Sequence, residues 1–379
     1  MRVFLAAMSL LAALLPMGPA SAVQITNVSA EPARVPQIED AEVALVFRLS
    51  EPASVTLNVY DGRDLLIRRI DSDGRIEAGD QRLTWDLRDQ SGRPVPAEAY
   101  HYTLIALSSA GRRVEHDLTD LTAGDDLVAT EVAWDPESKV IRYRLPAAGR
   151  VNIRVGLDDN GPLLATVLDW VVRDAGVHEE PWDGFDAAGV LDLSHHPKLA
   201  IAVDAFGLSD NSILVGPAAA RVELIRELPW GRERRVAQRH DRKRMHFHRQ
   251  QPLEERGDYR ISLTLPDNLP RDAEGLPILT GIVPIRLDVS EDDRERVLER
   301  RFEPVFFVDG TFVFENEVGF LPMTWRWDTA GVNQGVHFLT ANLRGYEGNF
   351  GMTTLKVRVM RMADEAQGSD AALISEERQ

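Results

Sequence analysis

Hydrophobic and polar residues alternate over short stretches along most of the chain. Residues 55–59 read Val-Thr-Leu-Asn-Val, and residues 100–104 read Tyr-His-Tyr-Thr-Leu. This period of two is typical of a strand with one buried face. Turn-forming pairs such as Asp61-Gly62 and Ser91-Gly92 separate the stretches, and long runs with a helical period are absent. The pattern predicts an all-β chain of short antiparallel strands.

The pattern of residues 44–59 returns in residues 140–155. Phe47 and Tyr143 lie 96 positions apart, and the Trp-Asp pairs that begin at Trp85 and Trp182 lie 97 positions apart. A repeat of about 100 residues has the size of one immunoglobulin-like β-sandwich. We therefore expect tandem immunoglobulin-like β-sandwiches.

Each copy carries a Trp-Asp motif followed by a turn. The motif residues are Trp85, Asp86, Asp89 and Gly92 in the first copy, and Trp182, Asp183, Asp186 and Gly189 in the second. Both copies resemble the immunoglobulin-like domain of the flagellar hook-capping protein family. We expect the Trp side chains to fill the core, the second Asp to accept hydrogen bonds from turn amides, and the Gly to adopt a positive φ. The second copy departs from the family after Gly189, where residues 191–197 replace a Pro-x-Gly-x-Tyr turn.

The C-terminal third resembles another immunoglobulin-like module, one found in tandem on bacterial surface proteins. The resemblance covers residues 281–285, 305–310, 322–329, 335–341 and 348–351. Its motif includes Trp327 and Asp328. Trp325 and Trp327 are two positions apart and so face one side of a strand. We expect core packing there, with a platform for stacking sugars as the alternative.

The first residues have the layout of a secretory signal peptide. Met1-Arg2 precedes an apolar run over residues 3–17, and Ala20-Ser21-Ala22 fits the cleavage rule. No later run approaches the length of a membrane span, so we expect no transmembrane segment after cleavage. We expect export to the periplasm or the exterior of a Gram-negative-type bacterium.

These patterns divide the chain into six parts. The predicted parts are a signal peptide (1–22), a first module (23–122), a second module (123–220), a basic linker with possible extra strands (221–275), a third module (276–362) and a disordered acidic tail (363–379).

The composition excludes several kinds of binding partner and site. The chain has 43 Lys and Arg residues against 60 Asp and Glu residues, a formal charge of −17, which argues against binding to nucleic acid. It has no Cys, so disulfides, thiolate metal sites, covalent haem and a lipoprotein anchor are excluded. Its exported domains must then be stable through packing alone.

One basic segment interrupts this acidic chain at residues 232–249. The candidate partner-binding residues there are Arg235, Arg239, Arg242, Lys243, Arg244, His246 and His248. Such a segment fits an acidic protein surface, a polyanion or an acidic glycan. The alternative is a solvated linker that pairs with the chain's own acidic surface. His246 and His248 have no third ligand nearby, so we expect no metal site.

Catalytic motifs are missing from the sequence. It has no Gly-x-Ser-x-Gly, no His-Glu-x-x-His and no Walker loop, and its Asp-rich turns at 71–74 and 158–161 lack EF-hand spacing. A carboxylate pair for glycoside hydrolysis needs no sequence proximity and stays an alternative. We expect no enzyme and no cofactor. The leading hypothesis is an exported scaffold or docking protein that presents interaction surfaces. The alternatives are a carbohydrate- or polyanion-binding protein, and an accessory factor of an exported filament, appendage or electron-transfer complex.

Overall fold

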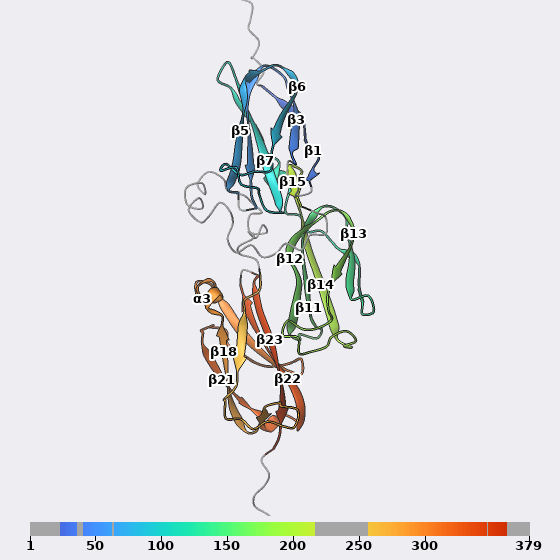
Figure 1. Cartoon of the computed structure of the whole chain (residues 1–379), viewed down its shortest axis with the longest axis vertical. Coiled ribbons are helices and arrows are strands. Elements are labelled where there is room, and N and C mark those ends of the chain that lie inside the picture. The colour runs from blue at the N-terminus through green and yellow to red at the C-terminus, as the bar shows by residue number, and fades with distance from the viewer. Residues whose placement is uncertain (1–22, 36–40, 63, 217–256, 347, 362–379) are drawn as a thin grey trace, which may run out of the picture.

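The computed structural model describes residues 23–35, 41–62, 64–216, 257–346 and 348–361 (Figure 1). The predicted signal peptide, basic segment and acidic tail lie outside these ranges. The described residues form three β-sandwiches, which we call the first, second and third modules. The prediction of an all-β fold of tandem immunoglobulin-like modules is confirmed.

The first module packs a three-stranded sheet on a larger one. The smaller sheet has the order β1 (Ile25–Glu31), β3 (Val43–Leu49) and β6 (Gly79–Trp85). The larger sheet has the order β2 (Arg34–Val35), β15 (Ser212–Val215), β7 (Ala99–Ser108), β4 (Ala53–Tyr60) and β5 (Leu66–Ile76), with β8 (Arg113–His116) also paired to β7. Trp85 is fully buried between the sheets and meets the edge of Tyr100.

Strand β15 comes after the second module in sequence but lies in the sheet of the first. Its residues pair with Ala99–His101 of β7, and Val215 pairs with Val35 of β2. The predicted boundary at residue 220 groups these residues with the second module. The second module therefore enters the first between β8 and β15.

The second module contains two three-stranded sheets. One has the order β13 (Gly176–Pro181), β10 (Val140–Leu145) and β9 (Thr130–Asp135), and the other has β12 (Leu163–Arg173), β11 (Gly149–Leu157) and β14 (Leu199–Gly207). Helix α1 (Thr119–Thr122) precedes this module. Trp182 packs in its core against Trp134, with ring centroids 4.7 Å apart.

The third module packs three strands on five. The smaller sheet has the order β16 (Ile261–Thr264), β18 (Ile282–Val289) and β21 (Met323–Asp328). The larger has β17 (Ile278–Leu279), β23 (Phe350–Val359), β22 (Gly335–Gly345), β19 (Phe302–Val308) and β20 (Thr311–Glu315). Helix α3 (Glu291–Leu298) and the 3₁₀ turn η3 (Thr329–Gly331) connect strands. Strand β16 falls within the segment predicted as a linker with possible extra strands.

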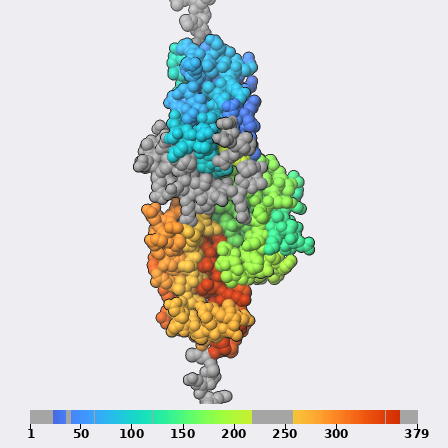
Figure 2. All heavy atoms as spheres, viewed as in Figure 1, coloured from blue at the N-terminus to red at the C-terminus, as the bar shows by residue number. Residues whose placement is uncertain are grey.

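The three modules are not arranged as a simple string. The first and second modules meet near the ends of β7 and β14, whereas the second and third modules lie side by side with β12 next to β23 (Figure 1). Figure 2 shows the second and third modules in contact along much of their length. The chain thus combines an end-to-end junction with a side-to-side junction.

The Trp-Asp motifs build matching turns in the first two modules. The indole Nε1–H of Trp85 donates to the Arg88 carbonyl at 3.0 Å, and that of Trp182 donates to the Phe185 carbonyl at 3.0 Å. Gly92 and Gly189 close the turns with φ of +78° and +67°, a conformation that favours glycine. These residues are therefore structural in both modules.

The two turn carboxylates differ in how many hydrogen bonds they accept. Asp89 Oδ1 accepts from the amides of Ser91 and Arg93, and its Oδ2 accepts from the Arg93 guanidinium at 2.8 and 3.0 Å. Burial would raise the pKa of Asp89, but these hydrogen bonds outweigh it and lower the pKa. Asp186 Oδ1 also accepts two amides, but a valine stands where Arg93 stands. Within the described residues, Asp186 Oδ2 has no hydrogen-bond partner.

We expect Asp89→Asn to destabilise the protein more than Asp186→Asn. The first change replaces an acceptor that faces a guanidinium with a donor, and hydrogen bonds to charged groups contribute about 1.5–3 kcal/mol. The second change alters an oxygen that accepts nothing. Urea unfolding followed by tryptophan fluorescence measures both variants. Equal losses would show that the Arg93 contact contributes nothing.

Candidate interaction surfaces

The predicted partner-binding residues of the basic segment fall outside the described residues. Their role therefore stays a prediction. The motif tryptophans Trp85, Trp182 and Trp327 all lie in module cores. Trp325 stacks on Trp327 and Phe314, with centroids 5.9 and 5.6 Å away, so its ring packs against the core. Asp328 accepts from the Ala330 amide and caps η3.

A third turn of the same type appears in the third module. Asp272 Oδ1 accepts from the amides of Glu274 and Leu276, and Gly275 has a φ of +81°. Its sequence, Asp-x-x-Gly, equals that of the other two turns, but no Trp-Asp pair precedes it. The spacing of Asp and Gly was the available signal for this turn.

A buried ion pair closes the junction between the first and second modules. Arg150 Nη1 of β11 donates to Glu98 Oε1 at 2.5 Å, and the side chains are 2% and 4% exposed. Gly62 lies against this guanidinium, since a Cβ there would be 3.1 Å from Arg150 Nη2. On the same junction, Arg34 Nε pairs with Asp174 at 2.6 Å. Side chains of both modules are thus needed to satisfy the charges at this contact.

Polar contacts run along the junction between the second and third modules. Asn342 of β22 bonds both backbone groups of Leu163, accepting from its N–H at 2.8 Å and donating to its C=O at 2.7 Å. Arg154 of β11 lies over the Phe350 ring and donates to the Gly348 carbonyl at 2.5 Å. Gly310 lies against Leu157. The C-terminal half of β11 and the start of β12 therefore hold the third module.

Two carboxylates meet at one end of this second junction. Asp169 of β12 accepts from Asn152 at 3.1 Å and from the amide of Gly257, while Asp258 accepts from Thr166 at 3.3 Å. Burial raises the pKa of Asp258 to about 7, and the carboxylate of Asp169 adds to the rise. Thr166, Arg154 and Arg296 oppose it. The protonated form of Asp258 is therefore the one that this junction favours.

The third module also exposes apolar side chains near one sheet edge. Phe312 lies on β20, Val318 and Phe320 follow it, and Tyr346 bonds to Glu303 on β19. Val318 is 77% exposed. Within the described residues, no group of three or more His, Asp or Glu side chains is placed to hold a metal ion. The third module therefore presents exposed apolar contact area along this edge.

Removing the buried carboxylate should strongly destabilise the first junction. We expect Glu98→Ala to cost about 3–5 kcal/mol, because the buried Arg150 guanidinium loses the carboxylate that bonds its Nη1. The matched control is Glu179→Ala, which breaks an exposed pair with Arg142 and should cost at most about 1 kcal/mol. Denaturant unfolding of both variants tests this. A small effect of Glu98→Ala would mean that the ion pair does not stabilise the junction.

Stability should fall as pH rises through the pKa of Asp258. The folded pKa lies above the ordinary value of 3.8, so the stabilisation is complete below that value and is lost as pH rises through about 7. Between these values the free energy of unfolding contributed by this group falls by about 1.4 kcal/mol per pH unit. Asp258→Asn should remove this component, as thermal unfolding at pH 5 and pH 8.5 would show. An unchanged difference between the two pH values in the variant would contradict the assignment.

One family model and several solved structures are similar to this chain. The family model of the FlgD Ig-like domain matches residues 35–111. Among solved structures, fibronectin(III)-like modules of Clostridium thermocellum CbhA align with 89% of this chain and 94% of theirs, at 12% identity and a TM-score of 0.20. A tetra-tandem repeat from the extending region of a large adhesion protein aligns with 89% of this chain and 74% of its own, at 14% identity and a TM-score of 0.19.

No curated protein matches the sequence. None of the helices in the described residues has the length and apolar character that a membrane span requires. The chain is built of tandem immunoglobulin-like β-sandwiches, and the first of them matches the FlgD Ig-like domain.

Proposed function

We propose that the protein is an exported, non-catalytic scaffold that holds docking surfaces at fixed positions in an envelope or extracellular assembly. The observation that carries the proposal is the construction of its two junctions. The first contains the buried Arg150–Glu98 pair, and the second contains the Asn342–Leu163 and Arg154–Gly348 contacts. Junctions of this kind oppose relative motion of the modules, which an array of independently moving binding modules does not need.

Chain connectivity supports the same function. The second module is inserted between β8 and β15 of the first, so two chain segments cross their junction. A single linker would leave the modules free to rotate about it, whereas two crossings and an ion pair restrict rotation. The molecule then fixes the distance between surfaces on the first and third modules.

Export and the partner-binding residues complete the proposal. The signal-like residues 1–22 support location in the periplasm or outside the cell, with cleavage before Val23. The basic segment would receive the protein partner, with the cluster Arg242, Lys243 and Arg244 at its centre. Polyanion or glycan binding through the same cluster is the second candidate, supported by its eight basic residues against two acidic ones within residues 232–249.

Distance measurements between modules test the scaffold directly. Because the chain has no Cys, Glu77→Cys and Arg326→Cys would introduce a single pair of spin labels, on exposed positions of the first and third modules. We expect one narrow distance distribution by pulsed electron spin resonance, and a broader one after Glu98→Ala. Dilution with unlabelled chain removes distances between molecules. A broad distance distribution in the labelled chain without further changes would contradict a fixed scaffold.

Crosslinking in the native envelope tests docking. We expect a specific crosslinked protein that is lost when Arg242, Lys243 and Arg244 are all changed to Gln, and that is weakened by Glu98→Ala. The control is Glu179→Ala, which leaves both junctions intact. A partner that survives the triple change would remove the basic segment as the docking site, and glycan-array binding of the same variants separates the second candidate.

A further inference from the structure

Strand β14 ends its sheet, whereas the equivalent strands of the other two modules, β7 and β22, each have a further strand beside them. In the first module β15 lies beside β7, and in the third module β23 lies beside β22; each added strand is flanked in turn by a short parallel strand, β2 or β17. In the second module β14 holds the equivalent position, and in the described chain its one strand partner is β11. The strand that follows β14 is β15, which pairs in the first module instead.

Part of this edge is already occupied. The Gly207 amide donates to the Asp125 carbonyl at 2.8 Å, and the Leu127 amide donates to the Ala205 carbonyl at 2.9 Å. Residues 205 and 207 therefore direct their backbone groups outward. Because these directions alternate along a strand, Ile201 and Val203 direct theirs outward as well. Among the described residues, nothing pairs with the outward groups of Ile201 and Val203.

The free part of β14 lacks the devices that protect edges from pairing. Its nine residues pair with β11 without a bulge, and Asp204 is its one charged residue. The two longer edge strands differ: β5 is bulged and carries several charges, and β12 is bulged and contacts β23. Natural edges are usually blocked by charge, proline or bulges. A bulge-free, largely apolar edge is therefore suited to accept another strand.

We propose that β14 pairs antiparallel with β14 of a second copy of this chain, about a two-fold axis through Ile201. This register places outward-directed residues opposite one another, with Ile201 facing Ile201 and Val203 facing Leu199. It also brings Asp204 opposite Lys198, twice. Asp204 lies on the even-numbered face of β14, and Lys198 directly precedes the strand, where its carbonyl accepts from the Asp158 amide at 2.9 Å. Each carboxylate then lies near an ammonium across the two-fold.

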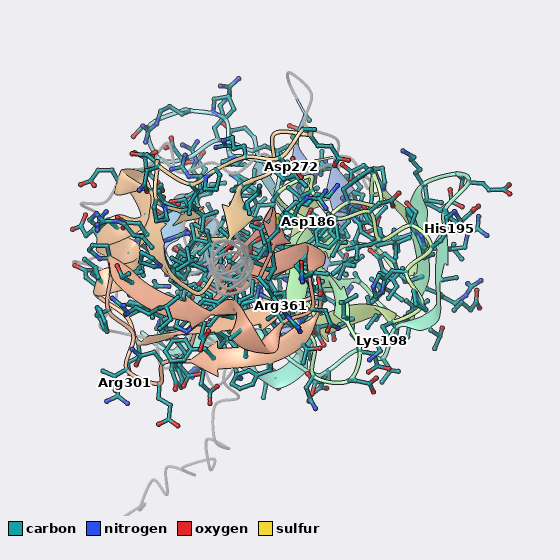
Figure 3. The ribbon with its side chains drawn as sticks, turned by 90° about the horizontal axis from the view of Figure 1, so that it is seen from below. Asp186, His195, Lys198, Asp272, Arg301 and Arg361 are labelled. Atoms are coloured by element: carbon teal, nitrogen blue, oxygen red, sulfur yellow. The ribbon has the colours of Figure 1, made fainter. Side chains whose placement is uncertain are left out.

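The third module and one existing hydrogen bond limit this pairing only in part. The third module contacts β12, at the opposite edge of the sheet β12-β11-β14, and also Arg154 and Leu157 of β11. The Leu199 amide already donates to the His196 carbonyl at 3.0 Å, so the new hydrogen bonds rest on the backbone groups of Ile201 and Val203. Figure 3 shows His195 and Lys198 toward the rim of the second module, away from the strands of the third. Lys198 pairs with Asp159 at 3.1 Å, but both side chains are more than half exposed, so this pair can exchange at little cost. The result is one continuous sheet of six strands and a closed, symmetric dimer.

Sedimentation or light scattering of the mature chain tests the proposal. We expect a concentration-dependent dimer at physiological ionic strength, where the repulsion between two acidic chains is screened. Ile201→Pro removes an outward N–H at the centre of the pairing and should make the chain monomeric. The control is Val177→Lys, an exposed change on β13 in the other sheet, which should leave the dimer unchanged.

Reversing the charges of Lys198 and Asp204 tests the register of the pairing. The same variants, when mixed, distinguish a lost contact from a misfolded chain. Lys198→Glu alone places two carboxylates opposite each other, and Asp204→Lys alone places two ammonium groups opposite each other. Each single variant should raise the dissociation constant of the dimer about tenfold or more. An equimolar mixture of the two variants should dimerise again, because every carboxylate then faces an ammonium, and a misfolded chain could not do this.

Three outcomes overturn the proposal. A chain that stays monomeric at all concentrations would show that β14 does not pair with a second copy, and a strand of another protein would then be the candidate partner. A dimer that survives Ile201→Pro, or single charge variants that dimerise as well as the original chain, would place the contact elsewhere. The scaffold proposal stands apart from these results, because its distance measurements are made within one chain.

Discussion

Strand β15 leaves the second module and pairs with β7 of the first, so the chain crosses the junction between these modules twice. Much of the architecture follows from this one pairing. It completes the larger sheet of the first module, and it ties the second module to the first at both ends. It also takes away the strand that would cover β14, and so opens an edge in the second module.

Charges buried between modules make the junctions specific. A buried ion pair adds less stability than apolar packing of the same volume would, because both groups lose their hydration. Its contribution here is geometric, because Arg150 and Glu98 meet at 2.5 Å in one relative placement of the modules. The same reasoning applies to Asn342, which bonds both backbone groups of Leu163 across the second junction. Without cysteines, the chain relies on such contacts and on its Trp-centred cores.

The second junction adds sensitivity to pH. Asp169 and Asp258 share a site with Arg154 and Thr166, and Asp258 gives up its proton near neutrality rather than in acid. Deprotonation places two neighbouring carboxylates in a partly buried contact. The contact between the second and third modules is therefore least stable under alkaline conditions.

The sequence by itself determined the fold class, the repeat and the two Trp-Asp turns, because these depend on alternation and on local hydrogen bonds between near neighbours. Asp89 and Gly92 shape a turn whose defining hydrogen bonds come from Ser91 and Arg93, within four residues of Asp89. The tertiary structure alone decided that β15 joins the first module, that Glu98 meets Arg150, and that Asp258 lies beside Asp169. These contacts join residues far apart in the chain, and the local pattern around each one is that of an ordinary strand or loop. The third Asp-x-x-Gly turn lies between the two cases: its spacing was visible, but its pairing with Arg358 required the folded module.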